Sequence, residues 1–332
     1  MRAASWSRRI ALVMSSPGAE VSAGGVRLVL LGAGTPTPSP TRFGSAQVLV
    51  VGDDQLMFDC GPAATHKLVK AGLWPTQITH LFFTHHHFDH DVDYPCLLLC
   101  RWDQGAGLER RLEVYGPAPT EGLTARLIGA GGAFEHDWRA RINFPGSQQV
   151  FVNRGGTLPR VPPEVNAQDI APGWSLDGPG WRVSTAVAEH VQPWLDSIAY
   201  RVDTPSVSVV FTGDTQPCRS VLELAAGADV LVSMCWDDEA TMVHNGEQRG
   251  QTGTLGAARL ARDAGVGHLV LTHMGRHVAS PEVLEPELAA MAEIFPGRIT
   301  VGEELLEVDL VAGAPAGASG GSSGVPAGQA GG

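Results

Sequence analysis

The chain has 332 residues, of which 23 are Lys or Arg and 35 are Asp or Glu, so its formal net charge is −12. This balance argues against a protein that coats nucleic acid, because a phosphate-binding surface needs clustered basic side chains. A hydrophobic fraction of 43% with 17% charged residues is typical of a globular protein with a sizeable core. Five cysteines without a Cys-x-x-Cys pair exclude a disulfide framework. Because no apolar run approaches the roughly 18 residues of a membrane span, we expect a cytoplasmic protein without a membrane partner.

Short apolar runs alternate with Gly and Pro along most of the chain, which predicts a strand-rich α/β fold. The strands expected in the first half are 26–31, 46–51, 55–58, 78–83 and 112–115, with a helix at 65–71. The strands expected in the second half are 183–188, 197–202, 207–212, 230–233 and 268–272, with helices at 219–226, 255–264 and 282–294.

Three segments lack this regular pattern. Residues 1–25 and 312–332 are rich in small residues without periodicity, so we expect flexible tails on either side of one domain over 26–311. Residues 134–180 are rich in Gly and Pro, which predicts a long irregular insertion that serves as a lid or a binding loop.

Four candidate metal ligands lie within six residues, directly after the strand expected at 78–83. They are His85, His87, Asp89 and His90. Imidazoles and carboxylates that converge from a short loop are donors that a divalent metal prefers, and four of them can serve two ions. Three further candidates each follow the end of an apolar strand. They are His190, Asp214 and His273, and together the seven residues predict a dinuclear site.

The spacing His-x-His-x-Asp-His at residues 85–90, followed by the later His, Asp and His, resembles the metallo-β-lactamase superfamily. The resemblance runs from about residue 26 to 311 and implies an αββα sandwich, in which two mixed β-sheets pack face to face with helices outside. It implies that the first metal is held by His85, His87 and His190, and the second by Asp89, His90 and His273. It also implies that Asp214 bridges the two metals and that Asp59 orients a ligand.

Two divalent cations at such a site predict hydrolysis. They lower the pKa of a bridging water toward neutrality, so that a metal-bound hydroxide attacks, and they neutralise the developing oxyanion. Asp89 and Asp214 are thereby the expected catalytic carboxylates. We expect Zn²⁺ because His and carboxylate suit it, and the same donors also accept Mn²⁺ or Fe²⁺.

Residues 30–36 (Leu-Leu-Gly-Ala-Gly-Thr-Pro) and 58–61 (Phe-Asp-Cys-Gly) resemble the ribonuclease Z-like branch, which includes tRNA 3′-processing enzymes, phosphodiesterases and arylsulfatases. The tRNA-processing members carry a glutamate and a histidine that act together at the leaving group, whereas this chain has Met234 and Gln251 at the matching positions. Gln251 can donate a hydrogen bond but cannot shuttle a proton near pH 7. A long basic arm for tRNA is also missing from residues 134–180, which contain several arginines but no lysine.

These departures favour a small-molecule hydrolase that cleaves an ester-type bond, namely a carboxylic ester, lactone, thioester or phosphodiester. One alternative is a ribonuclease Z-like tRNA 3′ endonuclease or phosphodiesterase, with nucleic acid as its partner. Another is an iron-dependent redox member of the superfamily. Relatives in this branch are often dimers, which leaves a homodimer open, although the sequence indicates no interface.

Five residues near the ligand segments are further candidates for the site. Arg276 and His277 follow His273 closely and are candidates for contacting an anionic substrate. Tyr94 and Trp194 are candidates for lining an apolar pocket, with packing in the core as the competing interpretation. His244 is a candidate for replacing the missing proton donor, with a solvated side chain as its alternative, and Gln251 is a catalytic candidate that would donate a hydrogen bond.

Overall fold

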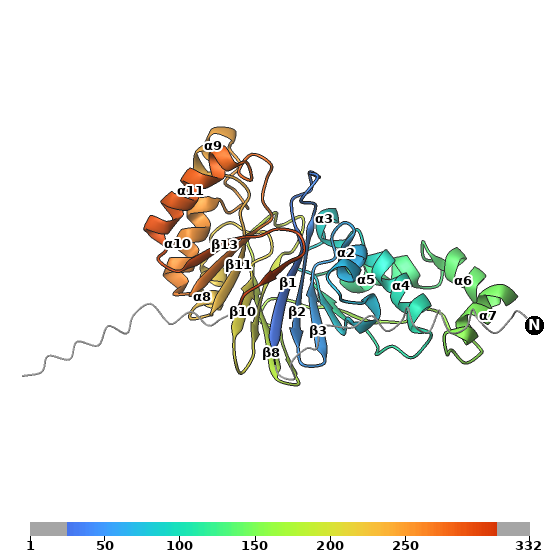
Figure 1. The fold of residues 1–332 in the computed structure, drawn as a ribbon. Helices are drawn as coiled ribbons and strands as arrows, with labels where there is room; N and C mark the ends of the chain where they lie inside the picture. Colours follow the sequence, from blue (N-terminus) through green and yellow to red (C-terminus); the bar gives the residue numbers. More distant parts are fainter. Residues whose placement is uncertain (1–24, 311–332) are drawn as a thin grey trace, which may run out of the picture.

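The computed structural model describes residues 25–310. Two seven-stranded β-sheets pack face to face, and helices cover their outer faces (Figure 1). This arrangement confirms the αββα sandwich. The two expected tails fall almost entirely outside the described residues.

The first sheet has the strand order β14-β1-β2-β3-β4-β5-β6. Its strands are β1 (Val26–Ala33), β2 (Ser45–Val51), β3 (Asp54–Phe58), β4 (His80–Phe82), β5 (Glu113–Gly116), β6 (Asn166–Asp169) and β14 (Leu306–Val308). The second sheet has the order β13-β12-β11-β10-β9-β8-β7. Its strands are β7 (Ser175–Gly178), β8 (Trp181–Val187), β9 (Ile198–Asp203), β10 (Ser208–Phe211), β11 (Val230–Met234), β12 (His268–Thr272) and β13 (Arg298–Val301).

Helices form an outer layer on each sheet. Those that follow strands of the first sheet are α2 (Ala64–Lys70), α3 (Phe88–Asp91), α4 (Tyr94–Gly105), α5 (Thr120–Ile128), α6 (Glu135–Asn143) and α7 (Pro145–Asn153), with a 3₁₀ turn at Pro75–Gln77. Those that follow strands of the second sheet are α8 (Arg219–Ala225), α9 (Glu239–Asn245), α10 (Thr254–Ala264) and α11 (Pro281–Ile294). In the described part of the chain, none of these helices combines the length and the apolar character that crossing a membrane would require.

The core between the sheets consists of apolar side chains that alternate along each strand. Phe58 on the first sheet stacks on Phe211 of the second, with ring centroids 4.0 Å apart, and on its neighbour Phe82 at 5.1 Å. A second apolar layer lies outside the second sheet, where the small side chains of Ala257 and Ala261 on α10 are fully buried against it. Because helices cover the outer faces of the sheets, strands such as β1 and β2 are buried on both faces. Their sequences are therefore almost continuously apolar.

The pairing of the strands brings the ends that precede the candidate ligands to one edge of the sandwich. β3, β4 and β5 are parallel in the first sheet, and β10, β11 and β12 are parallel in the second. β8 pairs antiparallel with β9, and β9 pairs antiparallel with β10, so β8 ends at the same edge as β10. The loops that leave these strands can therefore meet across the two sheets.

The segment 134–180 differs from the irregular lid expected there. It contains α6 and α7, and then β6 and β7, which are edge strands of the two sheets. In Figure 1, α6 and α7 lie at the end of the molecule remote from α9, α10 and α11. Arginines 141, 154 and 160 all pair with Asp103 of α4, so this segment is packed onto a helix of the outer layer.

Candidate metal centre

The turn that leaves β4 supplies four of the predicted ligands. His85 and His87 precede α3, while Asp89 and His90 lie in its single turn. All of them except His87 are fully buried. Nε2 of His85 lies only 3.0 Å from Nδ1 of His87, so these two imidazoles face one another.

The second sheet supplies the other three, each after the end of a strand. His190 follows β8, Asp214 follows β10 and His273 follows β12. Gly213, just before Asp214, has a φ of +57°, and a Cβ there would lie 2.7 Å from Cβ of Thr84. Only glycine allows this strand end to approach the turn after β4 so closely.

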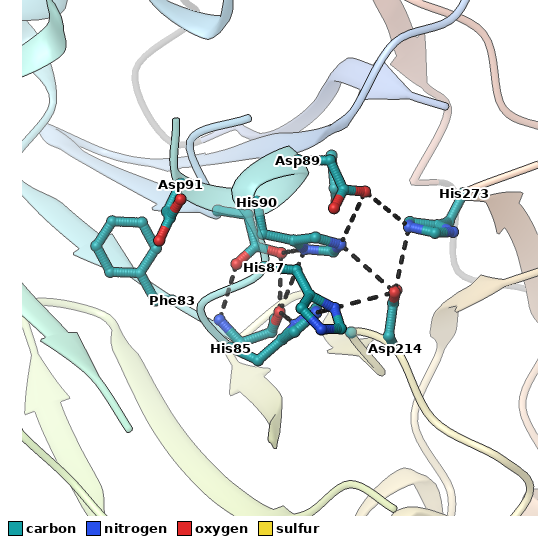
Figure 2. Close-up of polar contacts among 12 residues, drawn as sticks. Phe83, His85, His87, Asp89, His90, Asp91, Asp214 and His273 are labelled. Atoms are coloured by element: carbon teal, nitrogen blue, oxygen red, sulfur yellow. Dashed lines mark hydrogen bonds and ion pairs between the residues drawn. The ribbon is translucent and has the colours of Figure 1, made fainter. Parts of the chain in front are cut away.

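Asp214 lies among the imidazoles of both sheets, and Figure 2 shows its contacts with several of them. Its Oδ2 atom is 3.2 Å from Nε2 of His273, 3.6 Å from that of His90, 3.8 Å from that of His190 and 3.9 Å from that of His85. Asp214 thus lies where the resemblance implies a bridging carboxylate, and that it bridges two metals stays a prediction.

The donors fall into two groups, and within each group the ligand atoms lie within 4.8 Å of one another. The first group is His85, His87, His190 and Asp214, and the second is Asp89, His90 and His273. This division agrees with the expected assignment to two metals, with Asp214 counted in the first group. That these residues bind metal stays a prediction.

The donor set fits two divalent cations. The buried side-chain atoms without a hydrogen-bond partner among residues 25–310 include three that face the cluster: Oδ1 of Asp89, Nε2 of His90 and Oδ1 of Asp214. A buried polar atom without a partner costs about 1–3 kcal/mol, and more when it carries charge. Cations among these atoms would remove that cost.

The electrostatics of three of the donors also suit cations, whereas at His90 burial alone would lower the pKa but Asp214 and Asp59 outweigh this effect and raise it. Burial alone would raise the pKa of Asp214, but the neighbouring His273 and His90 outweigh this effect and hold that pKa well below its ordinary value. Burial lowers the pKa of His85 well below its ordinary value, and it also lowers the pKa of His87. The carboxylate is therefore ionised and these two imidazoles are neutral near pH 7, which are the forms that bind metals.

Two hydrogen bonds orient ligand imidazoles from behind. Asp59 Oδ2 accepts a hydrogen bond from Nδ1 of His90 at 2.7 Å, and its carboxylate also accepts from the backbone N–H and the hydroxyl of Thr84. The carbonyl oxygen of Gly250 accepts from Nδ1 of His190 at 2.7 Å. Each bond leaves Nε2 directed at the cluster. Asp59 is thus placed where the resemblance implies, and its effect on metal binding stays a prediction.

Tyr94 corrects the sequence interpretation, because it is a core residue and cannot line a substrate pocket. Its side chain is fully buried, its ring packs edge-on against Phe83 at 5.0 Å, and its hydroxyl lies 2.8 Å from that of Thr124 on α5. Trp194 lies in the loop that carries His190 and is 89% exposed, so it remains free to contact a substrate.

The residues at the expected leaving-group positions differ in their surroundings. Met234 is buried, and its Sδ atom accepts a hydrogen bond from the backbone N–H of Thr215. Gln251 directly follows Gly250, and its Oε1 atom is buried without a hydrogen-bond partner in the described part of the chain. His244 lies in the last turn of α9 with its side chain exposed, as the solvated alternative predicts. Catalytic roles for Gln251 and His244 stay predictions.

The loop after β12 carries both Arg276 and His277. Nδ1 of His277 lies 2.8 Å from Oδ1 of Asp237 and 3.4 Å from Oδ2 of Asp238. The hydrogen bond with Asp237 raises the pKa of His277 above its ordinary value. Asp237 was not among the residues proposed from the sequence, although it follows the end of β11 just as Asp214 follows β10, so its place at a strand end could have indicated it.

Comparison with known proteins identifies close sequence relatives. A family model described as a β-lactamase superfamily domain matches residues 55–274. A Ribonuclease Z from Mycobacterium bovis is 30% identical over 291 residues, which cover 86% of this chain and 98% of that protein.

Solved structures show the same fold. The metallo-β-lactamase fold protein YhfI from Bacillus subtilis superposes with a TM-score of 0.64 at 21% identity, covering 85% of this chain and 98% of its own. The short form of human tRNase Z superposes with a TM-score of 0.58 at 21% identity, covering 86% and 99% of the two chains.

Proposed function

We propose that this chain, which belongs to the β-lactamase superfamily, hydrolyses phosphodiester bonds with two divalent metal ions. The chain is a metal-dependent hydrolase with the histidine and aspartate clusters of that family. What carries the narrower proposal is a 30% identity to a Ribonuclease Z along nearly the whole described chain, together with a carboxylate shared between two donor groups. The relatives thus favour the ribonuclease Z-like alternative over the small-molecule ester that the sequence analysis preferred.

The ions, for which we propose zinc, would supply Lewis-acid chemistry by activating water and neutralising charge on the phosphoryl oxygens. His85, His87 and His190 would hold one ion, and Asp89, His90 and His273 the other, with Asp214 between them. The chain itself contributes the orientation of the ligand imidazoles. Asp59 accepts a hydrogen bond from Nδ1 of His90, and the carbonyl oxygen of Gly250 accepts one from Nδ1 of His190.

The departing oxygen must gain a proton, and neither Met234 nor Gln251 can donate one near pH 7. In our proposal His277 does so, held by Asp237 in the way that a carboxylate orients a catalytic imidazole. The support is its place in the loop that begins at His273, at the same edge of the sandwich, together with a half-exposed side chain that a substrate can reach.

An RNA 3′ end is the substrate class that the relatives suggest. The arginines of α6 and of the loop after α7 do not offer it a basic clamp, because Asp103 pairs with three of them. We therefore expect a short stretch of nucleotides to be held close to the metal centre. The cytoplasmic location remains a prediction from the sequence.

The test compares kcat/KM for bis(p-nitrophenyl) phosphate and for p-nitrophenyl acetate on the zinc-loaded protein. We expect the phosphodiester to be preferred, and Asp214→Ala to abolish that activity and lower the metal content, whereas Asp53→Asn, on an exposed turn, leaves both unchanged. A preference for the acetate that also depends on Asp214 would overturn the proposal and restore the carboxylic ester interpretation. A precursor tRNA is the next substrate if the phosphodiester is preferred.

A further inference from the structure

A hollow of about 240 Å³ lies beside the metal centre, between the loop that joins β1 to β2 and the loop that follows β12. Its polar lining comes from six residues: Thr37, Ser39, Thr41, Arg42, Arg276 and Ser280. Met274, which directly follows the ligand His273, also lines it. The backbone N–H of Met274 donates to the carbonyl oxygen of Ala33 at 3.1 Å, so the two loops are joined next to that ligand.

The lining has the chemistry of an anion site. It contains two guanidinium groups and four hydroxyls, and none of its residues is Asp or Glu. On a chain with a formal net charge of −12, a region lined in this way is where a polyanion meets little repulsion.

Several donors in the hollow are free to bind a ligand. Arg42 uses Nε and one terminal nitrogen on the carbonyl oxygen of Gly302, both at 3.3 Å, which leaves its other terminal nitrogen. Arg276 is exposed, and within residues 25–310 its guanidinium makes no hydrogen bond or ion pair. The Ser39 hydroxyl, by contrast, is engaged with Arg42 within its own loop. Arg276 is therefore the group whose charge a ligand would neutralise.

We propose that this hollow binds the phosphate group next to the one that is cleaved, so that the protein recognises a nucleotide chain by two consecutive phosphates. This inference rests on the proposed phosphodiesterase function. The scissile phosphate lies at the metal centre, and the neighbouring phosphate reaches Arg276, three residues after His273, and the free nitrogen of Arg42. Hydrogen bonds from a guanidinium to phosphate are charge-assisted, which makes them stronger than neutral ones.

The test measures binding by calorimetry on the zinc-loaded protein with two probes, thymidine 5′-monophosphate and thymidine 3′,5′-bisphosphate. We expect the second phosphate to tighten binding about tenfold in the parent protein, which corresponds to one charge-assisted hydrogen bond. Arg276→Gln should abolish this gain while leaving the affinity for the monophosphate within about twofold, and Arg276→Lys should restore part of it. Arg126→Gln, which removes an exposed arginine on α5, is the matched control and should retain the full gain.

Equal affinities for the two probes in the parent protein, or a gain that survives Arg276→Gln, would overturn the inference. Hydrolysis is followed separately with the p-nitrophenyl ester of thymidine 5′-monophosphate. If the parent protein fails to cleave this ester but still shows the gain that depends on Arg276, the proposed function is wrong while the phosphate site stands. If it cleaves the ester without any such gain, the function stands and the second phosphate site is wrong.

Discussion

The position of Asp59 has two requirements. Its backbone has a φ of +60°, and its carboxylate accepts a hydrogen bond from Nδ1 of His90. Asp59→Asn should meet the first requirement, because asparagine adopts the left-handed region readily, while it removes the charge. We expect metal affinity to fall about 10- to 100-fold with the fold retained, since partners of this kind tune the ligand that they orient. Competition with a chromogenic chelator measures this loss, and an affinity equal to that of Asp53→Asn would contradict it.

The pair formed by His277 and Asp237 gives a prediction about pH. Their hydrogen bond raises the pKa of His277, and Asp238 adds to the effect. A histidine whose pKa is raised on folding contributes stability below its unfolded pKa, and that contribution is lost as the pH rises through the folded value. Asp237→Asn should therefore lower the pKa of His277 in an NMR titration and destabilise the protein more near pH 5.5 than near pH 8.5.

The same variant tests the proposed proton donor. With a poor leaving group, the alkaline limb of the pH–rate profile should move to lower pH in Asp237→Asn, whereas hydrolysis of an activated nitrophenyl ester should change little, because that leaving group needs no proton. Equal effects on both substrates would mean that His277 has no part in leaving-group departure.

At the scale of elements, α6 and α7 are tied to α4 through Asp103. Burial alone would raise the pKa of Asp103, but its hydrogen bonds with Arg160 and Arg154 outweigh burial and lower that pKa. The stabilisation is therefore present above the unfolded pKa and is lost as the pH falls through the folded value. Asp103→Asn leaves the buried Arg160 without its ion-pair partner, and we expect a loss on the order of 3 kcal/mol.

Hydrogen exchange should show this loss as faster exchange over residues 135–160, with kcat for the phosphodiester unchanged. A large fall in kcat would revive the interpretation of this segment as a lid. Arg139→Gln, which breaks only an exposed pair with Glu135, is the control and should change neither quantity.

The elements that could be predicted from the sequence are those with a strong local pattern. The strands around β10, β11 and β12 are buried on both sides and read as apolar runs, so their bounds were close to those observed. The helices α6 and α7 are short and mostly exposed, and β6 and β7 are four-residue edge strands. These elements are held in place by tertiary contacts such as those of Asp103. Contacts of this kind leave no local pattern in the sequence.

The candidate site divides in the same way. The candidate ligands could be proposed from the sequence because each follows a buried strand and carries a metal-binding side chain. Of the groups that orient them, Asp59 could be proposed from the resemblance, whereas Gly250 could not, since it acts through its backbone oxygen. Tyr94 was a pocket candidate because it lies close to the ligand segment in the sequence, whereas the packing of α4 on α5 buries it, as the competing interpretation held.

At the scale of the whole molecule, the candidate ligands come from both sheets, so cations bound by them should stabilise the sandwich. Removing them would leave Asp89 and Asp214, at 1% and 4% exposure, with imidazoles such as that of His273 as their neighbours in place of cations. We expect a chelator to lower the melting temperature by on the order of 5–10 °C, because ions that bind only the folded state stabilise it. Scanning fluorimetry measures this shift, and Asp214→Ala should show a smaller one. An unchanged melting temperature in the parent protein would argue against a site that binds ions tightly.

The chain builds its two sheets almost one after the other, crossing from β6, which ends at Asp169, to β7, which begins at Ser175. A break in that connection would yield two fragments that share the centre, with four ligands on one and three on the other. Within residues 25–310, only β14 crosses back, pairing with β1 of the first sheet. Neither fragment alone should be active, and mixing them should restore hydrolysis as the sheets dock. The protein should therefore be suitable as a split-enzyme reporter, in which the appearance of activity reports the association of two fragments.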